Sequence, residues 1–466
     1  MSETTRVESD SMGEVALPAE ALYGAQTARA AANFPVSGRP MPPVFIKAVA
    51  AIKQAAAEVN GELGLLDERR VGWIATAAAE IIDDRWADQF PVDVFQTGSG
   101  TSTNMNVNEV IANRAIQLAG GAVGSRNPVH PNDHVNMGQS SNDVIPSALH
   151  VAAASEIRHW LLGELHDLAR VLMERACDFD GIVKIGRTHL QDAVPVRLGQ
   201  EFSGYATAVR RAIERLDRAA DDLCELPIGG TAVGTGLNTH PQFASGVCSR
   251  LGEMFEMPFR EASDHFAAQS NLDAVVAAAG ALKGAALTLG KIASDIRLLA
   301  SGPRCGIGEL ELPAIQPGSS IMPGKVNPVI CESVVQVACQ IVGCEAAVAA
   351  GATGGVGSIL ELNMAMPVIA VNLLDAIVLL ANVAEVFRVK CLEGLKADAR
   401  RCGELVERSL ALCTALATAI GYDAAAAVAK EAYATGQTVR QVARARQVLP
   451  DAELDRLLDP RGQTGA

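Results

Sequence analysis

The stretch Gly318-Ser319-Ser320-Ile321-Met322-Pro323-Gly324-Lys325-Val326-Asn327-Pro328 separates two long apolar parts of the chain. Its two glycines and two prolines exclude regular structure, so it is predicted to be a mobile loop. Asn327 and Pro328 suit the N-cap and first position of a helix over the apolar run 329–342. Backbone N–H groups at a helix start, together with the Lys325 ammonium, favour a bound carboxylate or phosphate. A serine beside that charge can act as a base; the alternative is an ordinary surface turn.

Composition predicts a helical protein with a small anionic ligand. Of the 466 residues, 49% are hydrophobic and only 4% are aromatic, which is typical of Ala/Leu/Val-rich helices. The formal net charge of −14 argues against nucleic acid or an anionic membrane surface as a partner. A small anionic substrate therefore requires a local positive pocket.

The cysteines and the N-terminal residues indicate the cellular compartment of the protein. The ten cysteines form no Cys-x-x-Cys pair, so neither a zinc site nor an iron–sulfur cluster is indicated, and we expect reduced thiols in the cytoplasm. The first ten residues are polar and acidic, and no charge-free apolar run approaches the length of a membrane span. We therefore expect no signal peptide and no membrane-spanning segment.

Hydrophobic periodicity predicts long helices. Apolar residues recur at steps of three and four over 157–172, 202–223 and 275–296. Residues 1–43 are expected to be mostly extended or loop, and helices are predicted over 44–60, 67–86, 107–118, 265–300 and 368–387. The last of these, and the helix after the opening loop, are apolar nearly all round and must be buried on every side. The three periodic runs and these two apolar helices make five long helices that cannot bury their apolar residues alone. They indicate a bundle that extends across subunits.

Three further loops gather polar side chains. Residues 96–106 are rich in hydroxyls and amides and lead into a helix, which suits anion binding or simply a capping turn. Residues 130–133 and 139–143 form a second cluster; a metal site at His130 and His134 is disfavoured because Pro131 intervenes and no third ligand follows. Residues 186–193 place His189 in a loop or bend, where the alternative is a structural histidine.

The opening stretch resembles the signature Gly-Ser-Ser-x-Met-Pro-x-Lys-x-Asn of the fumarase/aspartase superfamily and matches all seven fixed positions. Glycine at position 324 is similar to the class II fumarase form of this signature, since aspartases usually carry alanine there. The three polar loops are also similar to class II fumarase loops. The resemblance implies an all-α, mainly helical, three-domain fold with a central long-helix bundle. It further implies a homotetramer with a twenty-helix core and active sites shared between three subunits. The predicted domains are 1–141, 142–395 with the catalytic loop 318–328, and 396–466.

The resemblance also implies an activity, the reversible hydration of fumarate to (S)-malate in the tricarboxylic acid cycle, without metal or organic cofactor. Ser319 would be the base at C3, His189 paired with Glu332 the acid for the leaving hydroxide, and Lys325 a donor to the substrate carboxylate together with Asn327. Histidine at 189, where aspartases carry glutamine, suits water elimination because hydroxide must be protonated as it leaves. The remaining substrate-binding residues are Ser99, Gly100, Thr101, Ser140, Ser141, Asn142, Thr188, Ser320 and Val326.

Some alternatives remain open at this point. An accessory dicarboxylate site is implied at His130, Pro131, Asn132 and Asp133, but Arg126 lies four residues before His130, where many relatives have an arginine three before. Another superfamily lyase, above all an aspartate ammonia-lyase, is the second functional hypothesis. A catalytically silent structural relative is the third, and the presence of Ser319, His189, Lys325 and Glu332 argues against it.

Overall fold

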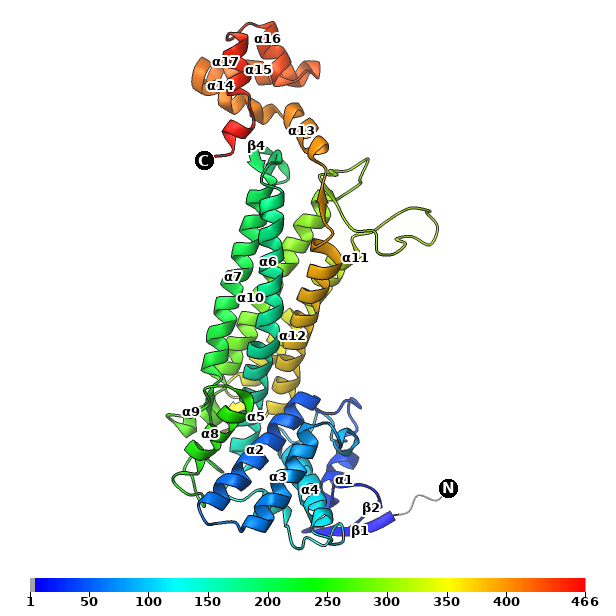
Figure 1. The fold of residues 1–466 in the computed structure, drawn as a ribbon, viewed down its shortest axis with the longest axis vertical. Helices are drawn as coiled ribbons and strands as arrows, with labels where there is room; N and C mark the ends of the chain where they lie inside the picture. Colours follow the sequence, from blue (N-terminus) through cyan, green and yellow to red (C-terminus); the bar gives the residue numbers. More distant parts are fainter. Residues whose placement is uncertain (1–4, 466) are drawn as a thin grey trace. The chain divides into compact units, whose positions relative to one another are not determined.

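A computed structural model describes residues 5–465 of the chain, which divides into two compact units. The first unit comprises residues 1–162, 214–284 and 339–380, and the second comprises 163–213, 285–338 and 381–466. Within residues 5–465 the structure has seventeen α-helices and five two-stranded sheets (Figure 1). The prediction of a mainly helical fold is therefore confirmed. The predicted boundaries of three domains stay a prediction.

The first unit is built on helices that bury alanine-rich faces. In α2 (Pro43–Glu62), the fully buried Ala50, Ala51 and Ile52 allow close approach of neighbouring helices. The elements of this unit are β1 (Thr5–Asp10), β2 (Gly13–Pro18), α1 (Ala25–Asn33), α2 (Pro43–Glu62), α3 (Glu68–Ile82), η1 (Ala87–Gln89), α4 (Thr101–Leu118), η2 (Pro131–Val135), α5 (Ser141–Glu156), η3 (Ile157–Leu161), β5 (Glu225–Leu226), α8 (Phe243–Phe255), β6 (Arg260–Glu261), α9 (His265–Ser270), β8 (Ser358–Ile359) and β9 (Leu362–Asn363).

The second unit contains a β-hairpin and a group of short C-terminal helices. The hairpin packs on these helices, since Ile185 belongs to their buried core together with Val406 and Leu412. Gly421 separates the helices Cys413–Ile420 and Tyr422–Thr435, and Gly436 ends the second of them with a left-handed backbone. The elements are α6 (Leu162–Asp178), β3 (Val183–Thr188), β4 (Gln191–Arg197), β7 (Leu310–Glu311), η4 (Arg388–Leu392), β10 (Lys396–Ala397), α13 (Ala399–Arg408), η5 (Leu410–Leu412), α14 (Cys413–Ile420), α15 (Tyr422–Thr435), α16 (Val439–Ala445), α17 (Asp451–Leu457) and η6 (Arg461–Gln463).

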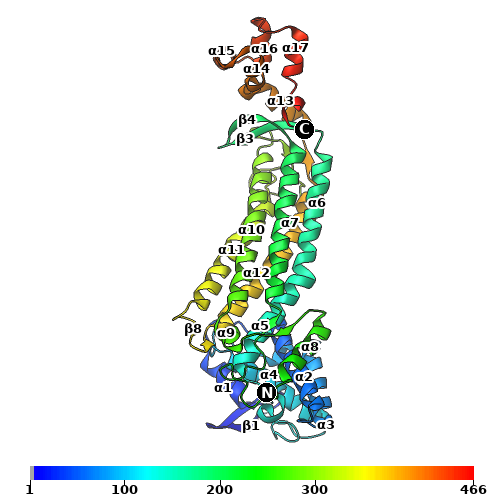
Figure 2. The same cartoon turned by 90° about the vertical axis from the view of Figure 1, so that its left-hand side faces the viewer.

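Four long helices contribute residues to both units: α7 (Leu198–Asp222), α10 (Asp273–Leu299), α11 (Val329–Ala352) and α12 (Met366–Phe387). In each unit their segments lie side by side (Figures 1 and 2). In the first unit Lys283 of α10 pairs with Glu345 of α11 at 2.7 Å. In the second unit Tyr205 of α7 donates to Asp295 of α10 at 2.9 Å. These four helices and α6 correspond to the five long helices that the sequence predicts for the bundle.

Three of the helices are also long and apolar enough to cross a membrane, judged by length and composition alone: Asp273–Leu299, Val329–Ala352 and Met366–Leu392. The most apolar window of Val329–Ala352 is only 33% buried within the chain, whereas that of Met366–Leu392 is 67% buried. The expectation that both helices are buried on every side is therefore not met within a single chain. Exposed apolar faces of this kind are typical of interaction surfaces.

The predicted helix boundaries need several corrections. The helix expected at 107–118 begins at Thr101, so most of the hydroxyl- and amide-rich run is its first turns rather than a loop. The helix expected at 265–300 is two helices, because Asn271 is extended (φ −97°, ψ 143°) and separates α9 from α10. Residues 1–43 contain α1 and the β1–β2 hairpin as well as loops. Asn327 does not cap α11 with its side chain as expected; its amide instead donates to the Gly318 carbonyl at 2.6 Å.

Candidate active site

A chain of three hydroxyls joins two of the predicted substrate loops. Thr101 Oγ1 lies 2.7 Å from Ser99 Oγ and 2.7 Å from Ser141 Oγ, although Thr101 and Ser141 are 40 residues apart in sequence. Thr101 begins α4 and Ser141 begins α5, so two helix N-termini supply backbone N–H groups at the same place. Such a cluster can hold a carboxylate by hydroxyl and backbone donors together.

The backbone of both loops is fixed by close contacts. A Cβ at Gly98 would lie 1.9 Å from the Met364 carbonyl oxygen, so only glycine fits before Ser99. In the second loop, Ser140 forms a capping box with Asp143: its Oγ accepts from the Asn142 N–H at 3.2 Å and its own N–H donates to Asp143 at 2.9 Å. The Asn142 side chain donates to the Ala232 carbonyl at 2.8 Å.

The predicted catalytic loop is closed at its base. The Gly318 N–H donates to the Lys325 carbonyl at 2.7 Å, and the Asn327 amide donates to the Gly318 carbonyl. A Cβ at Gly318 would meet the Lys325 oxygen at 2.6 Å, which explains why glycine is required there. The segment between these residues is exposed, with Ile321 84% and Met322 49% accessible. The segment is thus an exposed surface loop that leads into the N-terminus of α11.

Ser319 lies inside this loop with its oxygen turned to backbone donors. Its Oγ accepts from the Met322 N–H at 3.0 Å and from the Ile321 N–H at 3.3 Å. Hydrogen bonds donated to an oxygen stabilise negative charge on it and so favour the alkoxide. The role of Ser319 as a base stays a prediction.

His189 occupies the tip of the β3–β4 hairpin. The pairing of Thr188 with Gln191 leaves His189 and Leu190 as the two turn residues, and both have positive φ, 54° and 60°. Two-residue turns with this backbone normally contain Asn and Gly, so a histidine and a leucine there are strained. Strained non-glycine residues concentrate at functional sites, and the exposed tip leaves His189 accessible. The predicted bend is confirmed.

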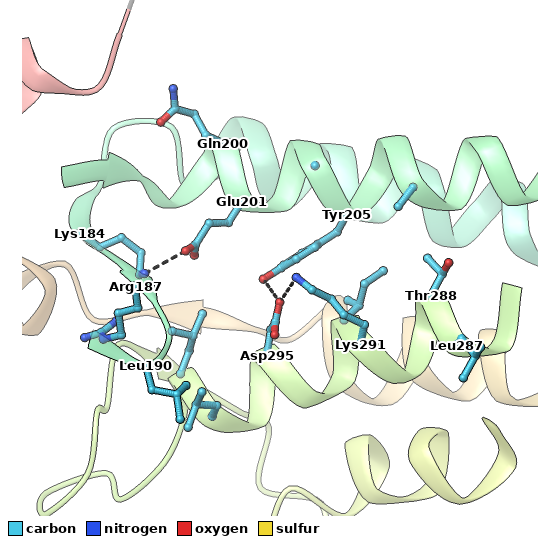
Figure 3. Close-up of a pocket in the computed structure, with 15 residues that line it drawn as sticks. Lys184, Arg187, Leu190, Gln200, Glu201, Tyr205, Leu287, Thr288, Lys291 and Asp295 are labelled. Carbon is cyan, nitrogen blue, oxygen red and sulfur yellow. Dashed lines mark hydrogen bonds and ion pairs between the residues drawn. The ribbon is translucent and has the colours of Figure 1, made fainter. Parts of the chain in front are cut away.

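A buried charge network anchors this hairpin. Arg187 donates two hydrogen bonds of 2.9 Å to Glu309, whose side chain is fully buried. Lys184, equally buried, lies 3.3 Å from Glu309 and 3.0 Å from Glu201. Burial raises the pKa of the Glu201 carboxyl. Lys184, Arg187 and Glu201 line a cavity of about 790 Å³ that also contains the Tyr205–Asp295–Lys291 cluster (Figure 3).

The predicted catalytic residues are not linked to one another within one chain. In residues 5–465 no hydrogen bond or ion pair joins His189 to Glu332 or to Ser319, so the His189–Glu332 pairing stays a prediction. The predicted set is divided between the units, with Ser99, Gly100, Thr101, Ser140, Ser141 and Asn142 in the first and Thr188, His189, Ser319, Ser320, Lys325, Val326, Asn327 and Glu332 in the second.

The predicted accessory site lies beside the N-terminal hairpin. A cavity of about 250 Å³ is lined by Arg126, His130, Pro131 and Asn132, and also by Glu8, Asp10 and Glu109. His130 Nδ1 accepts from the backbone N–H groups of Asn132 and Asp133 at 3.2 Å each. The Arg126 guanidinium donates to the Ser9 carbonyl, so it is held by the hairpin.

Sequence reasoning missed the buried charges beneath these loops. Lys53 in α2 is fully buried and donates to Asn136 and Gln139 at 2.9 Å each. Asp143 is also fully buried, and burial raises the pKa of its carboxyl. A signal for Lys53 was present, since it is a charged residue within the otherwise apolar run 48–57, interrupted only by Gln54.

Comparison with known proteins shows the family to which the chain is similar. A family model described as "Lyase" matches residues 13–343, and one described as "Fumarase C C-terminus" matches residues 412–464. The chain is 53% identical over 464 residues to "Fumarate hydratase class II" of Halobacterium salinarum, covering 100% of this chain and 98% of the relative. It is 51% identical over 456 residues to the protein of the same name from Thermosynechococcus vestitus, covering 98% and 97%.

A solved structure agrees with these sequence matches. The crystal structure of recombinant class II fumarase from Schistosoma mansoni superimposes with a TM-score of 0.96 at 39% identity, covering 99% of both chains. Identity of this extent over the whole length exceeds what a shared fold alone requires. The chain therefore belongs to the class II fumarase family.

Proposed function

We infer that this chain is a fumarate hydratase, a hydro-lyase that interconverts fumarate and (S)-malate. The observation that carries this conclusion is full-length identity of 51–53% to proteins named class II fumarate hydratases. These relatives favour the hydratase over the aspartate ammonia-lyase alternative. The hydroxyl cluster of Ser99, Thr101 and Ser141 supports it, because the cluster can hold one carboxylate of a dicarboxylate.

The proposed mechanism is acid–base catalysis on the dicarboxylate. Ser319 removes the C3 proton, and its two backbone N–H donors stabilise the alkoxide that this requires. Lys325 and Asn327 donate to the carboxylate that gathers charge in the transition state. His189, with Glu332, protonates the departing hydroxide. Thr188, Ser320 and Val326 complete the substrate contacts of the second unit, and Ser99, Gly100, Thr101, Ser140, Ser141 and Asn142 those of the first.

We further propose that four copies assemble and that each active site takes residues from three of them. Two observations support this assembly: the apolar window of Val329–Ala352 is only 33% buried in one chain, and His189 has no hydrogen bond to Glu332 within it. The small dicarboxylate is the proposed ligand, with neither nucleic acid nor membrane as a partner. The accessory site at His130–Asp133 is proposed to bind a second dicarboxylate.

We also propose a cytoplasmic location and a role in the tricarboxylic acid cycle. All ten cysteines are free, and seven of them are buried, as suits a reducing compartment. The location can be tested by fractionation of cells that express the chain. A disulfide in the isolated protein would count against it.

The activity is tested by following fumarate absorbance with (S)-malate as substrate. The purified chain should form fumarate from malate and release little or no ammonia from aspartate. Ammonia release from aspartate at a rate that matches malate dehydration would contradict the proposal. The reaction should need no added metal, and prior dialysis against a chelator should leave the rate unchanged.

A further inference from the structure

A lysine lies fully buried beneath the substrate loop that begins α5. Lys53 has no accessible surface, and its ammonium donates to two side-chain amide oxygens, Asn136 Oδ1 and Gln139 Oε1, at 2.9 Å each. Among residues 5–465 no carboxylate lies within ion-pair distance of it. Burying an ammonium against neutral groups is unfavourable, and lysines are almost never fully buried unless they are paired with an opposite charge.

The two amides that Lys53 contacts fix the segment before the loop. The Asn136 amide nitrogen donates to the Gln139 carbonyl at 3.1 Å. The Gln139 amide nitrogen donates in turn to the carbonyls of Val135 and Met137, both at 3.1 Å. Gln139 immediately precedes Ser140, the N-cap of α5. Lys53 thus holds the residues from which the substrate loop starts.

The helix that supplies Thr101 meets Lys53 at the same atom. Asn136 Oδ1 accepts from Asn104 and Asn108 of α4 at 3.2 Å each, in addition to Lys53. Three donors therefore converge on one carbonyl oxygen, which has two lone pairs. This atom joins α2, α4 and the segment before α5 in one polar network.

A buried carboxylate lies under the same loop. Asp143 accepts from the N–H groups of Ser140, Gly229 and Thr231 at 2.9, 3.0 and 2.9 Å. When it is ionised, Asp143 opposes the binding of a dianion at the neighbouring Ser141 and Asn142. Asp143 is the ionisable group whose charge acts on Lys53, whereas α4 and the segment 135–139 present uncharged amides to it.

We propose that Lys53 is a positioning residue for the dicarboxylate site: it holds Asn136 and Gln139, and thereby Ser140-Ser141-Asn142, and its charge offsets that of Asp143. This inference rests on the proposed function, because it concerns the same substrate. Lys53 itself does not touch the substrate loop's hydroxyls and takes no part in proton transfer.

Titration of Lys53 should make dicarboxylate binding depend on pH. Burial lowers the pKa of Lys53 to about 7, and the nearby Asp143 charge acts in the opposite direction. The ammonium is therefore lost as pH rises through neutrality. Binding of a dicarboxylate then weakens, because the charge of Asp143 is no longer offset.

The test compares Lys53→Met with two other variants. Lys53→Met keeps the length of the side chain and removes its donors and charge. It should raise KM for malate and the Kd for succinate, a non-reacting C4 dicarboxylate, by about tenfold while kcat changes by less than about threefold. Gln139→Met should have the same effect, and the double variant should be no worse than the more affected single variant, since both act through one contact.

The control is Ile52→Val, an equally buried neighbour in α2 that is wholly apolar. It should lower thermal stability and leave KM and Kd unchanged. Between pH 6.5 and 8.5 the succinate Kd should rise in the wild type and in Ile52→Val but should stay flat in Lys53→Met. A purely structural lysine would not produce that difference.

The possible failures are distinguishable. A folded Lys53→Met protein with wild-type KM, Kd and pH dependence overturns the inference. If Lys53→Met does not fold, Gln139→Met decides, and a wild-type KM and Kd in that variant overturns it equally. A wild-type protein that does not turn over malate overturns the proposed function instead, and the succinate Kd series still tests the role of Lys53.

Discussion

Arg187 and Glu309 form a two-bond ion pair, with both nitrogen–oxygen distances at 2.9 Å, between residues 122 positions apart in sequence. The Glu309 side chain is fully buried, and Lys184 lies 3.3 Å from the same carboxylate. Because Arg187 is two residues before His189, this pair sets the position of the hairpin tip. The candidate catalytic histidine is therefore held by an interaction close to the turn of its hairpin.

Removing the Glu309 charge should disturb both stability and turnover. Glu309→Gln leaves the largely buried Arg187 without its carboxylate and Lys184 with Glu201 as its remaining partner. The change should cost about 3 kcal/mol of folding free energy. The change is measured as a lower thermal midpoint by circular dichroism. Malate turnover should also fall, because the hairpin loses its anchor. The exposed neighbour Glu311 in β7 provides the control, and Glu311→Gln should change neither quantity.

Ser319→Ala should remove turnover and leave the fold intact. The Ser319 side chain contacts only backbone N–H groups of its own loop, so its loss affects stability little. If Ser319 is the base, kcat for malate dehydration should fall about a thousandfold. Gln316→Ala, an exposed change just before the loop, should keep wild-type kcat. Near wild-type turnover by a folded Ser319→Ala protein would remove Ser319 from the base role.

His189→Asn should lower malate turnover by about a hundredfold or more, since the general acid for the leaving hydroxide is lost. Asparagine is the suitable replacement because it tolerates the positive φ of 54° at this turn position. Circular dichroism and the thermal midpoint should therefore stay at wild-type values. If the variant keeps wild-type kcat, the proposed role of His189 is wrong, while the assignment of the reaction stands.

How far the sequence predicts the fold is seen in α3 and α4. The apolar spacing of Ile74, Ala77, Ala78 and Ile81 predicts a helix over 67–86, and α3 indeed runs over Glu68–Ile82. α4 begins six residues before its prediction because Thr, Ser and Asn disfavour helix interiors, yet Asn104 and Asn106 are buried and hydrogen-bonded there. Tertiary contacts outweigh local propensity in such a case, and a single sequence does not reveal them.

The candidate site also has a part that the sequence predicts and a part that it does not. Its loops stand out in the sequence because glycine, proline and hydroxyl residues are concentrated in them. The residues that hold the loops do not, since Lys53 contacts a residue 83 positions away and Arg187 one 122 positions away. Spacing along the chain carries no information about pairs this distant. The sequence therefore indicates the candidate chemistry, whereas the residues that hold the loops in place are identified only from the three-dimensional structure.

The assembly prediction follows from the exposed apolar face of α11. Light scattering should give a mass of four chains of 48.6 kDa each. Val342 in α11 is 38% exposed in the single chain, and Val342→Lys should dissociate the assembly and abolish activity because a charge is buried at the contact. The control is Leu65→Lys, which places the same charge at an apolar residue that is 50% exposed between α2 and α3. A stable, active monomer would contradict the shared site.

The pH dependence of stability should differ between the wild type and Lys53→Met. The pKa of Lys53 is about 7 when folded, below its ordinary value of 10.5, so above pH 7 the unfolded chain binds more protons than the folded one. Stability contributed by this residue therefore rises as pH increases from about 7 toward 10.5.

Asp143 acts in the same direction in this comparison. Its pKa is raised by burial and lowered by Lys53, so losing the lysine raises it further and makes ionisation in the folded variant more unfavourable. The Lys53→Met variant thus loses stability relative to the wild type as pH rises above 3.8, the ordinary pKa of an aspartate carboxyl. Thermal midpoints at pH 6, 7, 8 and 9 should show the wild type gaining on Lys53→Met at each step. A constant or reversed difference would contradict both the lowered pKa of Lys53 and its effect on Asp143.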